Sequence, residues 1–391
     1  MLCRPDKGQV LALKPIQVCH LASGDLWAGA EVQIATLLRA LKADQRFDLS
    51  AIVLNKGRLA EELVAAGISV TVCDESAGAW TTLRSLVAHL RRRRPDIVHS
   101  HRYKEHIFGA FAAKLSHNSR VVQTYHGLEE HLHGWAAMKM RAYTTLNTIV
   151  GKVAAQGFVG VSEEIAAILR WRYASGKVRC IRNGVDLTRV KATSSGACLR
   201  NQLGISSSEF VIGSVGRLTP VKGIEYLIRA VSKNRRSQER KLIIVGDGPL
   251  RPALEELARE VGVAGSVLFL GARNDVYDLM GVFDVLALPS LHEGVPMVLL
   301  EAMAMAVPII ASRVGGIPEI LDDEQGALLV QARDVDVLAD AIETMANDEV
   351  LRNRLRKAAR ARVESRFSIE RTAALTGDLY CELMGNSRVP A

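Results

Sequence analysis

The chain alternates short apolar runs with stretches in which apolar residues recur at helical spacing, and it does so in two successive series. Apolar runs of this length between turns are typical of buried parallel strands. Amphipathic segments separate most of them, which predicts right-handed βαβ units and a doubly wound parallel sheet. The first series holds the runs Ile16–Leu21, Ser50–Leu54, Ser69–Cys73, Asp96–Ser100, Arg120–Tyr125, Gly157–Val161 and Val178–Ile181.

A second series begins after residues 191–208, which are rich in Ser, Ala and Gly and show little periodicity. We therefore predict an α/β fold with two domains, residues 1–187 and 209–366, joined by a linker at 188–208. Residues 367–391 carry one more helical segment, Ile369–Met384, with no strand after it. The second series holds the runs Phe210–Val215, Leu242–Val245, Val267–Leu270, Asp284–Leu288, Ile309–Ala311 and Ala327–Val330.

The run Asp284–Leu288 leads into the stretch with the most distinctive chemistry. After a loop, Pro296 stands where a helix can begin, because the missing N–H of proline needs no partner at a first helical position. The N–H groups of Met297, Val298 and Leu299 would then lack partners within the helix. Such a helix start suits a phosphate group.

Two carboxylates flank this helix start. Glu293 precedes it, and Glu301 lies inside the helix, roughly 7.5 Å along the axis from Pro296. A diphosphate at the helix start would place the ribose of the same nucleotide near Glu301. A carboxylate suits ribose, since it accepts hydrogen bonds from two adjacent hydroxyls.

Two further loops follow predicted strands of the second series. In Gly216–Gly223, Arg217 and Lys222 stand five positions apart around a proline turn. A guanidinium fork and a compact ammonium suit a diphosphate, although basic loop residues are often only solvated. The loop Gly246–Leu250 (GDGPL) opens another helix, and its glycines suit a tight turn near a nucleotide rather than a nicotinamide fingerprint.

Two loops of the first series carry weaker signals. Ser23–Glu31 contains Gly29, which suits close approach to a ligand and equally suits a plain tight turn. Thr124–Gly127 ends a predicted strand and contains His126, whose imidazole can hydrogen-bond sugar hydroxyls near neutral pH. The alternative for His126 is a surface histidine.

Composition limits the partners and excludes several classes. The net charge is +8 and the pI near 9.2, which favours anionic partners. Six scattered cysteines without a CxxC pair argue against a zinc site and a disulfide framework. We expect no signal peptide, because the N-terminus has no continuous apolar core, and we expect no membrane span and no nucleic-acid-binding module.

These motifs together resemble the retaining glycosyltransferases of the family 4 type. The resemblance rests on the E-x7-E pair Glu293 and Glu301, the R-x4-K pair Arg217 and Lys222, the GDGP loop and the HG pair that begins at His126. It implies a GT-B fold, in which two Rossmann-like doubly wound domains face each other across a cleft. The first domain would hold the acceptor and the second the nucleotide sugar, and the C-terminal helix would return to the first domain.

The resemblance also implies roles for residues of this chain. His126, Arg217, Lys222 and Glu293 would act in catalysis, with no metal and no cofactor. Of the first loop only Gly29 carries over, because Ala28 replaces a glycine of the family pattern. Arg273 would border the base. The expected donor-binding residues are Gly29, Gly216, Gly246, Arg273, Gly294, Val295, Pro296, Met297, Val298 and Glu301.

The expected activity is retaining transfer of a hexose-type sugar from a nucleoside diphosphate sugar, with UDP favoured, to a saccharide or lipid-linked acceptor. We expect a cytoplasmic enzyme with peripheral contact to the anionic inner face of a membrane and no nucleic acid partner. Arg91–Arg94 and the helical stripe from Trp135 to Ile149 suit such a contact, although a solvated helix end and core packing are their default explanations. Two alternatives remain: a nucleotide-sugar 2-epimerase on the same fold, and a non-catalytic binder of anionic ligands.

Overall fold

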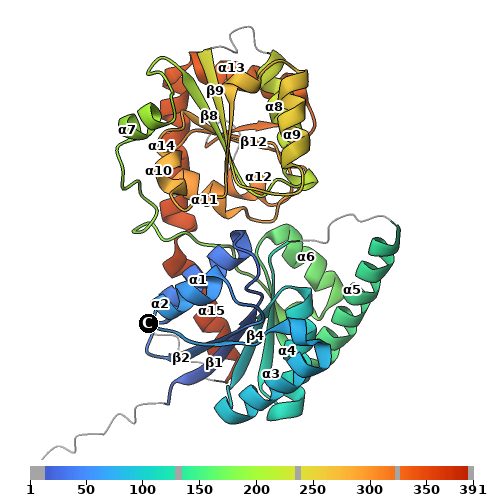
Figure 1. The fold of residues 1–391 in the computed structure, drawn as a ribbon. Helices are drawn as coiled ribbons and strands as arrows, with labels where there is room; N and C mark the ends of the chain where they lie inside the picture. Colours follow the sequence, from blue (N-terminus) through green and yellow to red (C-terminus); the bar gives the residue numbers. More distant parts are fainter. Residues whose placement is uncertain (1–13, 128–133, 234–238, 322–325, 386–391) are drawn as a thin grey trace, which may run out of the picture.

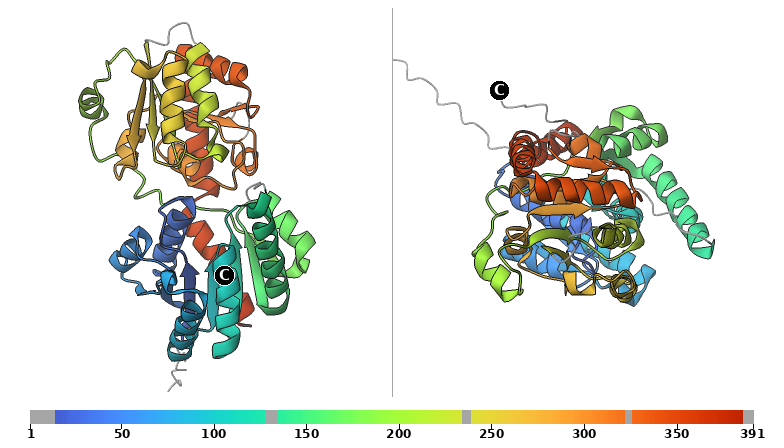
Figure 2. Two further views of the ribbon diagram at one scale, coloured as in Figure 1. Left: turned by 45° about the vertical axis from the view of Figure 1, so that its right-hand side comes forward. Right: turned by 90° about the horizontal axis from the view of Figure 1, so that it is seen from above.

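The computed structural model describes residues 14–127, 134–233, 239–321 and 326–385. Within these ranges the chain forms two parallel sheets, each covered by helices on both faces (Figures 1 and 2). The chain therefore has the two Rossmann-like domains that the two series of apolar runs predict, and it has the GT-B fold that the resemblance implies.

The first sheet has the strand order β3-β2-β1-β4-β5-β6-β7. Its order reverses between β1 and β4, so the carboxyl ends of these strands border a crevice where such folds bind ligands. The strands are β1 (Ile16–Ala22), β2 (Phe47–Val53), β3 (Ser69–Val72), β4 (Ile97–His101), β5 (Arg120–Tyr125), β6 (Ala155–Gly160) and β7 (Val178–Cys180). Its helices are α1 (Gly29–Leu41), α2 (Arg58–Ala65), α3 (Ala79–Arg93), α4 (Tyr103–Ser116), α5 (Gly134–Ala154) and α6 (Glu163–Arg172).

The second sheet repeats this order as β10-β9-β8-β11-β12-β13, with the reversal between β8 and β11. Its strands are β8 (Phe210–Val215), β9 (Arg240–Val245), β10 (Val267–Gly271), β11 (Val285–Leu288), β12 (Ile309–Ser312) and β13 (Leu328–Val330). The helices are α7 (Gly196–Gln202), α8 (Ile224–Lys233), α9 (Arg251–Glu260), α10 (Val276–Met280), α11 (Met297–Ala304), α12 (Ile317–Ile320), α13 (Val335–Asn347) and α14 (Glu349–Arg366).

The last helix, α15 (Ile369–Leu383), leaves the second domain and packs on α1 and β6 of the first (Figure 1). The crossing is held by backbone pairing, since Val185 N–H donates to Phe367 and Ile369 N–H donates to Val185. Tyr380 of α15 is fully buried against the first sheet. The C-terminal segment thus contributes to the core of the domain at the other end of the chain.

Hydrophobic periodicity predicts every strand that the structure describes, with boundaries that shift by up to three residues. One local prediction is wrong. Pro296 is the residue before α11 rather than its first residue, with φ −69° and ψ 123°, and the helix begins at Met297. The reason is that Pro296 keeps extended backbone torsions while its carbonyl already accepts from Leu299 N–H at 3.1 Å.

Candidate active site

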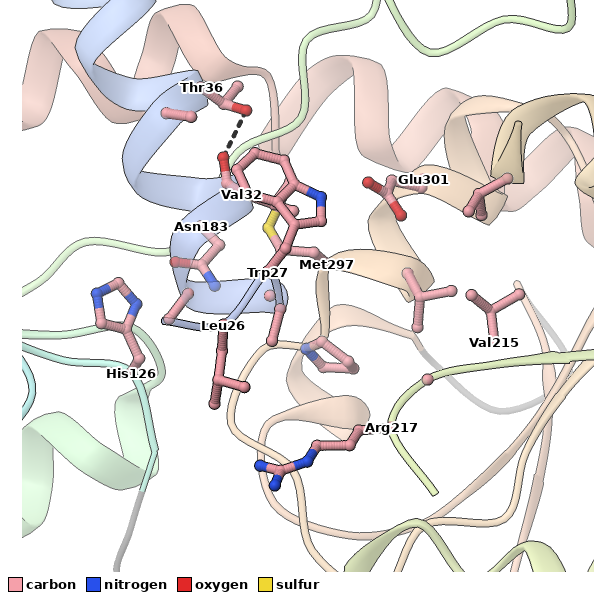
Figure 3. Close-up of a pocket in the computed structure, with 18 of the residues that line it drawn as sticks. Leu26, Trp27, Val32, Thr36, His126, Asn183, Val215, Arg217, Met297 and Glu301 are labelled. Carbon is pink, nitrogen blue, oxygen red and sulfur yellow. Dashed lines mark hydrogen bonds between the residues drawn. The ribbon is translucent and has the colours of Figure 1, made fainter. Parts of the chain in front are cut away.

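A cleft of about 1080 Å³ lies between the two domains. It is lined by loops at the carboxyl ends of β1, β4, β5, β8, β9, β10 and β11. Every residue that the sequence analysis assigns to the site lies on its wall: Gly29, His126, Gly216, Arg217, Lys222, Gly246, Arg273, Glu293, Gly294, Val295, Pro296, Met297, Val298 and Glu301. Figure 3 shows His126, Arg217, Met297 and Glu301 around this cleft.

The start of α11 supplies the helix end predicted for a phosphate. The first N–H groups of a helix have no acceptor inside it, and those of Met297 and Val298 stand at the cleft end of α11. The sequence analysis also expects the N–H group of Leu299 to lack a partner, and this is wrong, because Leu299 N–H donates to the carbonyl of Pro296. The remaining pair and the helix dipole favour an anion.

Glu301 lies on the cleft wall and is largely buried by its surroundings, with 9% of its surface exposed. This burial raises the pKa of its carboxyl to about 7, and the Tyr277 hydroxyl, which donates to Oε1 at 3.1 Å, acts weakly in the opposite direction. Glu301 therefore exchanges a proton near neutral pH. In its ionised form it can accept hydrogen bonds from two ribose hydroxyls.

Glu293 and Lys222 form an ion pair across the nucleotide side of the cleft. Lys222 Nζ donates to Glu293 Oε1 at 2.6 Å, and the Ser290 hydroxyl donates to the same oxygen at 2.7 Å. Both charged side chains are largely buried. Arg217, by contrast, is exposed and extends into the cleft (Figure 3). Lys222 is thus paired with a carboxylate, whereas Arg217 is exposed to solvent.

At two glycine positions the backbone of another loop lies too close for a side chain. A Cβ atom on Gly246 would lie 1.9 Å from the carbonyl oxygen of Gly216, and the φ of Gly246 is +132°. A Cβ on Gly294 would lie 2.6 Å from the carbonyl oxygen of His126. The first contact joins two nucleotide-side loops. The second joins the two domains at the cleft, where only glycine fits without displacing backbone.

His126 is half-buried on the first-domain wall. Its Nε2 lies 3.0 Å from Nδ1 of His101, and its Nδ1 has no hydrogen-bond partner within the described residues. Burial, with a smaller contribution from the Arg102 guanidinium, lowers the pKa of His126 to about 3. The ring is therefore neutral at physiological pH and has one N–H group.

Two predicted donor-binding residues have contacts within the protein. Arg273 lines the cleft, but its guanidinium donates from Nε and Nη2 to the two carboxylate oxygens of Asp275, at 2.8 and 2.6 Å. A contact with a base would have to share or replace this pair. Gly29 begins α1 and faces Met297, since a Cβ there would lie 3.7 Å from Met297 Cγ.

Sequence reasoning missed several residues on the first-domain wall. Arg102 follows β4 at its carboxyl end, a position that could have indicated it, and it forms an ion pair with buried Glu31 at 2.8 Å. Asn183 bridges the domains, because its side-chain amide donates to the carbonyl of Val295 at 3.0 Å. No local motif marks it. The wall also contains Trp27, Arg39, Arg58, Tyr103, Asp186 and Arg189.

Two other sequence features have structural explanations. The acids Asp334 and Asp336 stand two positions apart, the DxD spacing of some metal sites, but Asp334 caps α13 by accepting from Val337 N–H and Asp336 pairs with Lys233, so both act at a helix start. Arg91–Arg93 close α3, and Arg94 follows in a left-handed conformation as its cap. The Trp135 side chain lies outside the described part of the structure. In the part that is described, no helix has the length and apolarity to cross a bilayer.

Sequence comparison identifies the family. Residues 27–189 match the family described as Glycosyltransferase Family 4, and residues 198–362 match Glycosyl transferases group 1. A glycosyltransferase of Methanocaldococcus jannaschii is 31% identical over 304 residues, which cover 74% of this chain and 77% of that protein. The chain belongs to the family 4 glycosyltransferases. This confirms the resemblance and the enzyme class, namely sugar transfer from a nucleotide sugar to an acceptor.

Further similarities of this family 4 glycosyltransferase extend over nearly its whole length. The UDP-Gal:alpha-D-GlcNAc-diphosphoundecaprenol alpha-1,3-galactosyltransferase of Escherichia coli is 28% identical over 382 residues, covering 95% of this chain and 98% of the relative. Among solved structures, Anabaena HepE in complex with UDP superposes with a TM-score of 0.81 at 22% identity, covering 94% of this chain and all of HepE. The glycosyltransferase WaaG superposes with a TM-score of 0.74 at 16% identity, covering 93% and 99%.

Proposed function

We propose that this glycosyltransferase moves a hexose from a UDP-sugar to a saccharide or lipid-linked acceptor, with retention of the anomeric configuration. The observation that carries the proposal is the convergence of Arg217, Lys222, the start of α11 and Glu301 on one cleft. The first three supply positive charge for a diphosphate, and Glu301 supplies an acceptor for ribose at the far side of the helix start.

The choice of UDP rests on two proteins that this chain is similar to. The E. coli relative is named for UDP-Gal, and HepE has been crystallised with UDP and with UDP-glucose. The base would lie beyond Glu301, near Arg273 at the edge of the cleft. The cations of the nucleotide-side loops and the place of Glu301 on α11 support these positions for the diphosphate and the ribose.

In the proposed reaction, negative charge grows on the departing diphosphate and positive charge on the sugar ring. Arg217, Lys222 and the start of α11 would stabilise the diphosphate. Because Lys222 now contacts Glu293, the incoming phosphate would share its ammonium, and Glu293 would then orient the sugar or the phosphate. Glu293 is tied to Lys222 and Ser290 and is no free nucleophile, so we favour departure and attack on one face of the sugar.

The acceptor would bind on the first-domain wall, which carries the cations Arg39, Arg58, Arg102 and Arg189. A cationic wall suits an acceptor that carries a diphosphate, as the E. coli relative's name describes for its own substrate. Contact with the inner face of a membrane stays a prediction. Exposed apolar side chains of α5, such as Ile149 and Val153, offer a surface for it.

The experiment is a transfer assay with UDP-galactose, UDP-glucose and GDP-mannose against N-acetylglucosamine linked to a lipid diphosphate. The anomeric coupling in the proton NMR spectrum of the product reports the configuration, which we expect to match the donor. Donor incubated alone should keep its sugar unchanged, which separates transfer from 2-epimerisation. A product of opposite configuration would refute retention, and transfer only from GDP-mannose would refute the choice of UDP.

A further inference from the structure

Trp27 and Arg58 form a stacked pair on the first-domain wall of the cleft. Arg58 Cζ lies 4.6 Å from the centroid of the Trp27 ring, which is within the range of a cation–π contact. Both residues line the cleft. Trp27 belongs to the loop between β1 and α1 and packs against the apolar cluster around α1 and α2, and Arg58 is the first residue of α2.

Backbone contact between two loops brings this pair together. A Cβ atom on Gly57 would lie 2.0 Å from the carbonyl oxygen of Gly24, and a Cβ on Gly24 would lie 2.2 Å from the carbonyl oxygen of Asn55. Only glycine allows so close an approach. Because β1 and β2 are neighbouring parallel strands, their loops leave the same edge of the sheet. The contact places Arg58, the residue after Gly57, over the ring of Trp27.

The edges of the Arg58 guanidinium are held by two other side chains. Nη1 donates to Oδ1 of Asn274 at 2.5 Å, and Nε lies 3.6 Å from Oε1 of Glu62, which balances the charge. The Arg58 side chain nevertheless keeps 36% of its surface exposed. One face of the guanidinium lies on the indole and two of its edges are engaged, so we infer that its second planar face is the part that is open to the cleft.

The stacked pair lies at the nucleoside end of the cleft. Asn274 belongs to the second domain, in the loop between β10 and α10, and Tyr277 of α10 donates to Glu301, the carboxylate assigned to ribose. In the view of Figure 3, the indole of Trp27 lies between Val32 and Glu301. A base attached to a ribose at Glu301 would therefore lie within reach of Arg58.

The open face of Arg58 suits a flat ring better than a phosphate. A guanidinium binds phosphate through the N–H groups of its edges, and two edges of Arg58 are already engaged by Glu62 and Asn274. Its planar face, by contrast, stacks on the π-face of a nucleobase. Contacts with Trp27, Glu62 and Asn274 fix the orientation of this face before a ligand arrives.

We propose that Arg58, held flat on Trp27, is the stacking platform for the base of the nucleotide sugar. The first domain would thus complete a donor pocket whose other contacts come from the second domain. The inference rests on the proposed function, because it takes the ligand to be a nucleoside diphosphate. Arg58 is the binding residue in this account, and Trp27, Glu62 and Asn274 are positioning residues.

The direct test removes the platform and the base separately. Isothermal titration calorimetry measures the binding of UDP and of ribose 5-diphosphate, which lacks the base, to wild type and to Arg58→Ala. We expect Arg58→Ala to bind UDP about tenfold more weakly, as loss of a stacked base implies, and to bind ribose 5-diphosphate as wild type does. Equal weakening of both ligands would place Arg58 on the phosphates or reflect only the lost contact with Asn274, and would overturn the proposal.

A charge-conserving variant separates stacking from electrostatic attraction. Arg58→Lys keeps the positive charge but has no planar surface, so we expect it to bind UDP as weakly as Arg58→Ala. Wild-type affinity in Arg58→Lys would overturn the proposal. The control is Arg259→Ala, which removes an exposed arginine paired with Glu256 on the surface of α9 and should change the binding of neither ligand.

Two variants of Trp27 test its positioning role. Trp27→Ala removes the ring beneath the guanidinium, and we expect it to weaken UDP binding while leaving the affinity for ribose 5-diphosphate unchanged. Trp27→Phe keeps an aromatic face there and should retain most of the wild-type affinity for UDP. Equal UDP affinities in Trp27→Ala and wild type would refute this role.

The same titrations distinguish this inference from the proposed function. If wild type bound none of UDP, GDP and ADP, the proposed function would fail and the base platform with it. If wild type bound UDP and Arg58→Ala bound it equally well, the base platform alone would be refuted.

Discussion

Lys222 Nζ lies 2.6 Å from Glu293 Oε1, although 71 positions separate the two residues in the chain. The contact joins the loop after β8 to the loop after β11, at the point where the strand order of the second sheet reverses. Each side chain keeps the other's charge compensated in a largely buried position. A bound diphosphate would take up the ammonium and change the environment of Glu293 in the same step.

Replacing the cations on the nucleotide side should stop turnover without unfolding the protein. We expect Lys222→Ala and Arg217→Ala each to lower kcat by about 100-fold or more, since charge that develops on a leaving group is worth several kcal/mol to stabilise. The control is Lys233→Ala, which removes a half-exposed lysine paired with Asp336 on the surface of the same domain. Steady-state kinetics and circular dichroism measure the two properties. Near-normal kcat in both cleft variants would contradict the site.

The raised pKa of Glu301 should make the protein less stable as pH rises. Its folded pKa is about 7 against an ordinary 4.5, so between these values the folded state binds more protons than the unfolded state. Stability from this group is complete below about pH 4.5 and is lost as pH rises through about 7, a change of about 3 kcal/mol.

Glu301→Gln is the comparison for this effect, because an amide has no such titration and the contributions of the buried histidines cancel between the two proteins. Melting temperatures of both are measured from pH 4.5 to pH 8. We expect the wild type to lose roughly 6 to 12 °C relative to Glu301→Gln across this window. If the melting temperatures of the two proteins changed in parallel with pH, the pKa of Glu301 would not be raised in the folded state.

Ionisation of Glu301 should also strengthen binding of the donor. A carboxylate accepts hydrogen bonds from two ribose hydroxyls, whereas the protonated acid uses one oxygen as a donor. Affinity for a UDP-sugar should therefore rise as pH increases through about 7, and isothermal titration calorimetry measures it. Each phosphate of a nucleotide sugar has one ester bond and one anhydride bond and no second ionisable oxygen, so the phosphates do not titrate near pH 7. A flat profile would refute the ribose contact.

Tyr277 should set the pH at which donor binding becomes stronger. Its hydroxyl donates to Glu301 Oε1 and lowers the pKa of that carboxyl, so Tyr277→Phe should move the binding midpoint to higher pH.

Gly294 lies so close to the first domain that a residue with a side chain should not fit there. A Cβ there would lie 2.6 Å from the carbonyl oxygen of His126, so Gly294→Ala must separate the domains or shift the loop. Overpacking of this kind costs about 1–3 kcal/mol, and we expect kcat to fall about tenfold or more. Gly127→Ala is the matched control in the same cleft, since a Cβ at Gly127 meets no atom of the described residues within 4 Å. Equal kinetics of the two variants would contradict the close approach.

The sequence was sufficient for the fold and for the nucleotide side of the cleft because the signals there are local. Strand-forming runs mark the sheet, and Glu301 lies on the short helix that begins directly after Pro296, so that its distance from the helix start can be calculated. Even there, the exact start of α11 depended on the extended torsions of Pro296, which proline permits as readily as helical ones.

The first-domain wall could not be predicted in the same way. Asn183 contributes through a contact with Val295 on the other domain, and His126 contacts His101, which is linked through His20 to Tyr380, more than 250 positions from His126 in the chain. Neither pair has a spacing motif, because the partners meet only after the sheets form and α15 crosses back. Buried histidines on alternate strand positions also resemble ordinary core residues until their ring partners are known.

The most direct test of nucleotide-sugar binding in this cleft is a thermal-shift comparison of wild type and Glu301→Ala with UDP, GDP, ADP and no ligand, with Glu256→Ala on the surface of α9 as the control. A nucleotide at about 100 times its dissociation constant adds roughly 2.7 kcal/mol of stability. We predict that UDP raises the melting temperature of wild type and Glu256→Ala and that Glu301→Ala loses this shift. No shift with any nucleotide, or an equal UDP shift in Glu301→Ala, would contradict the account.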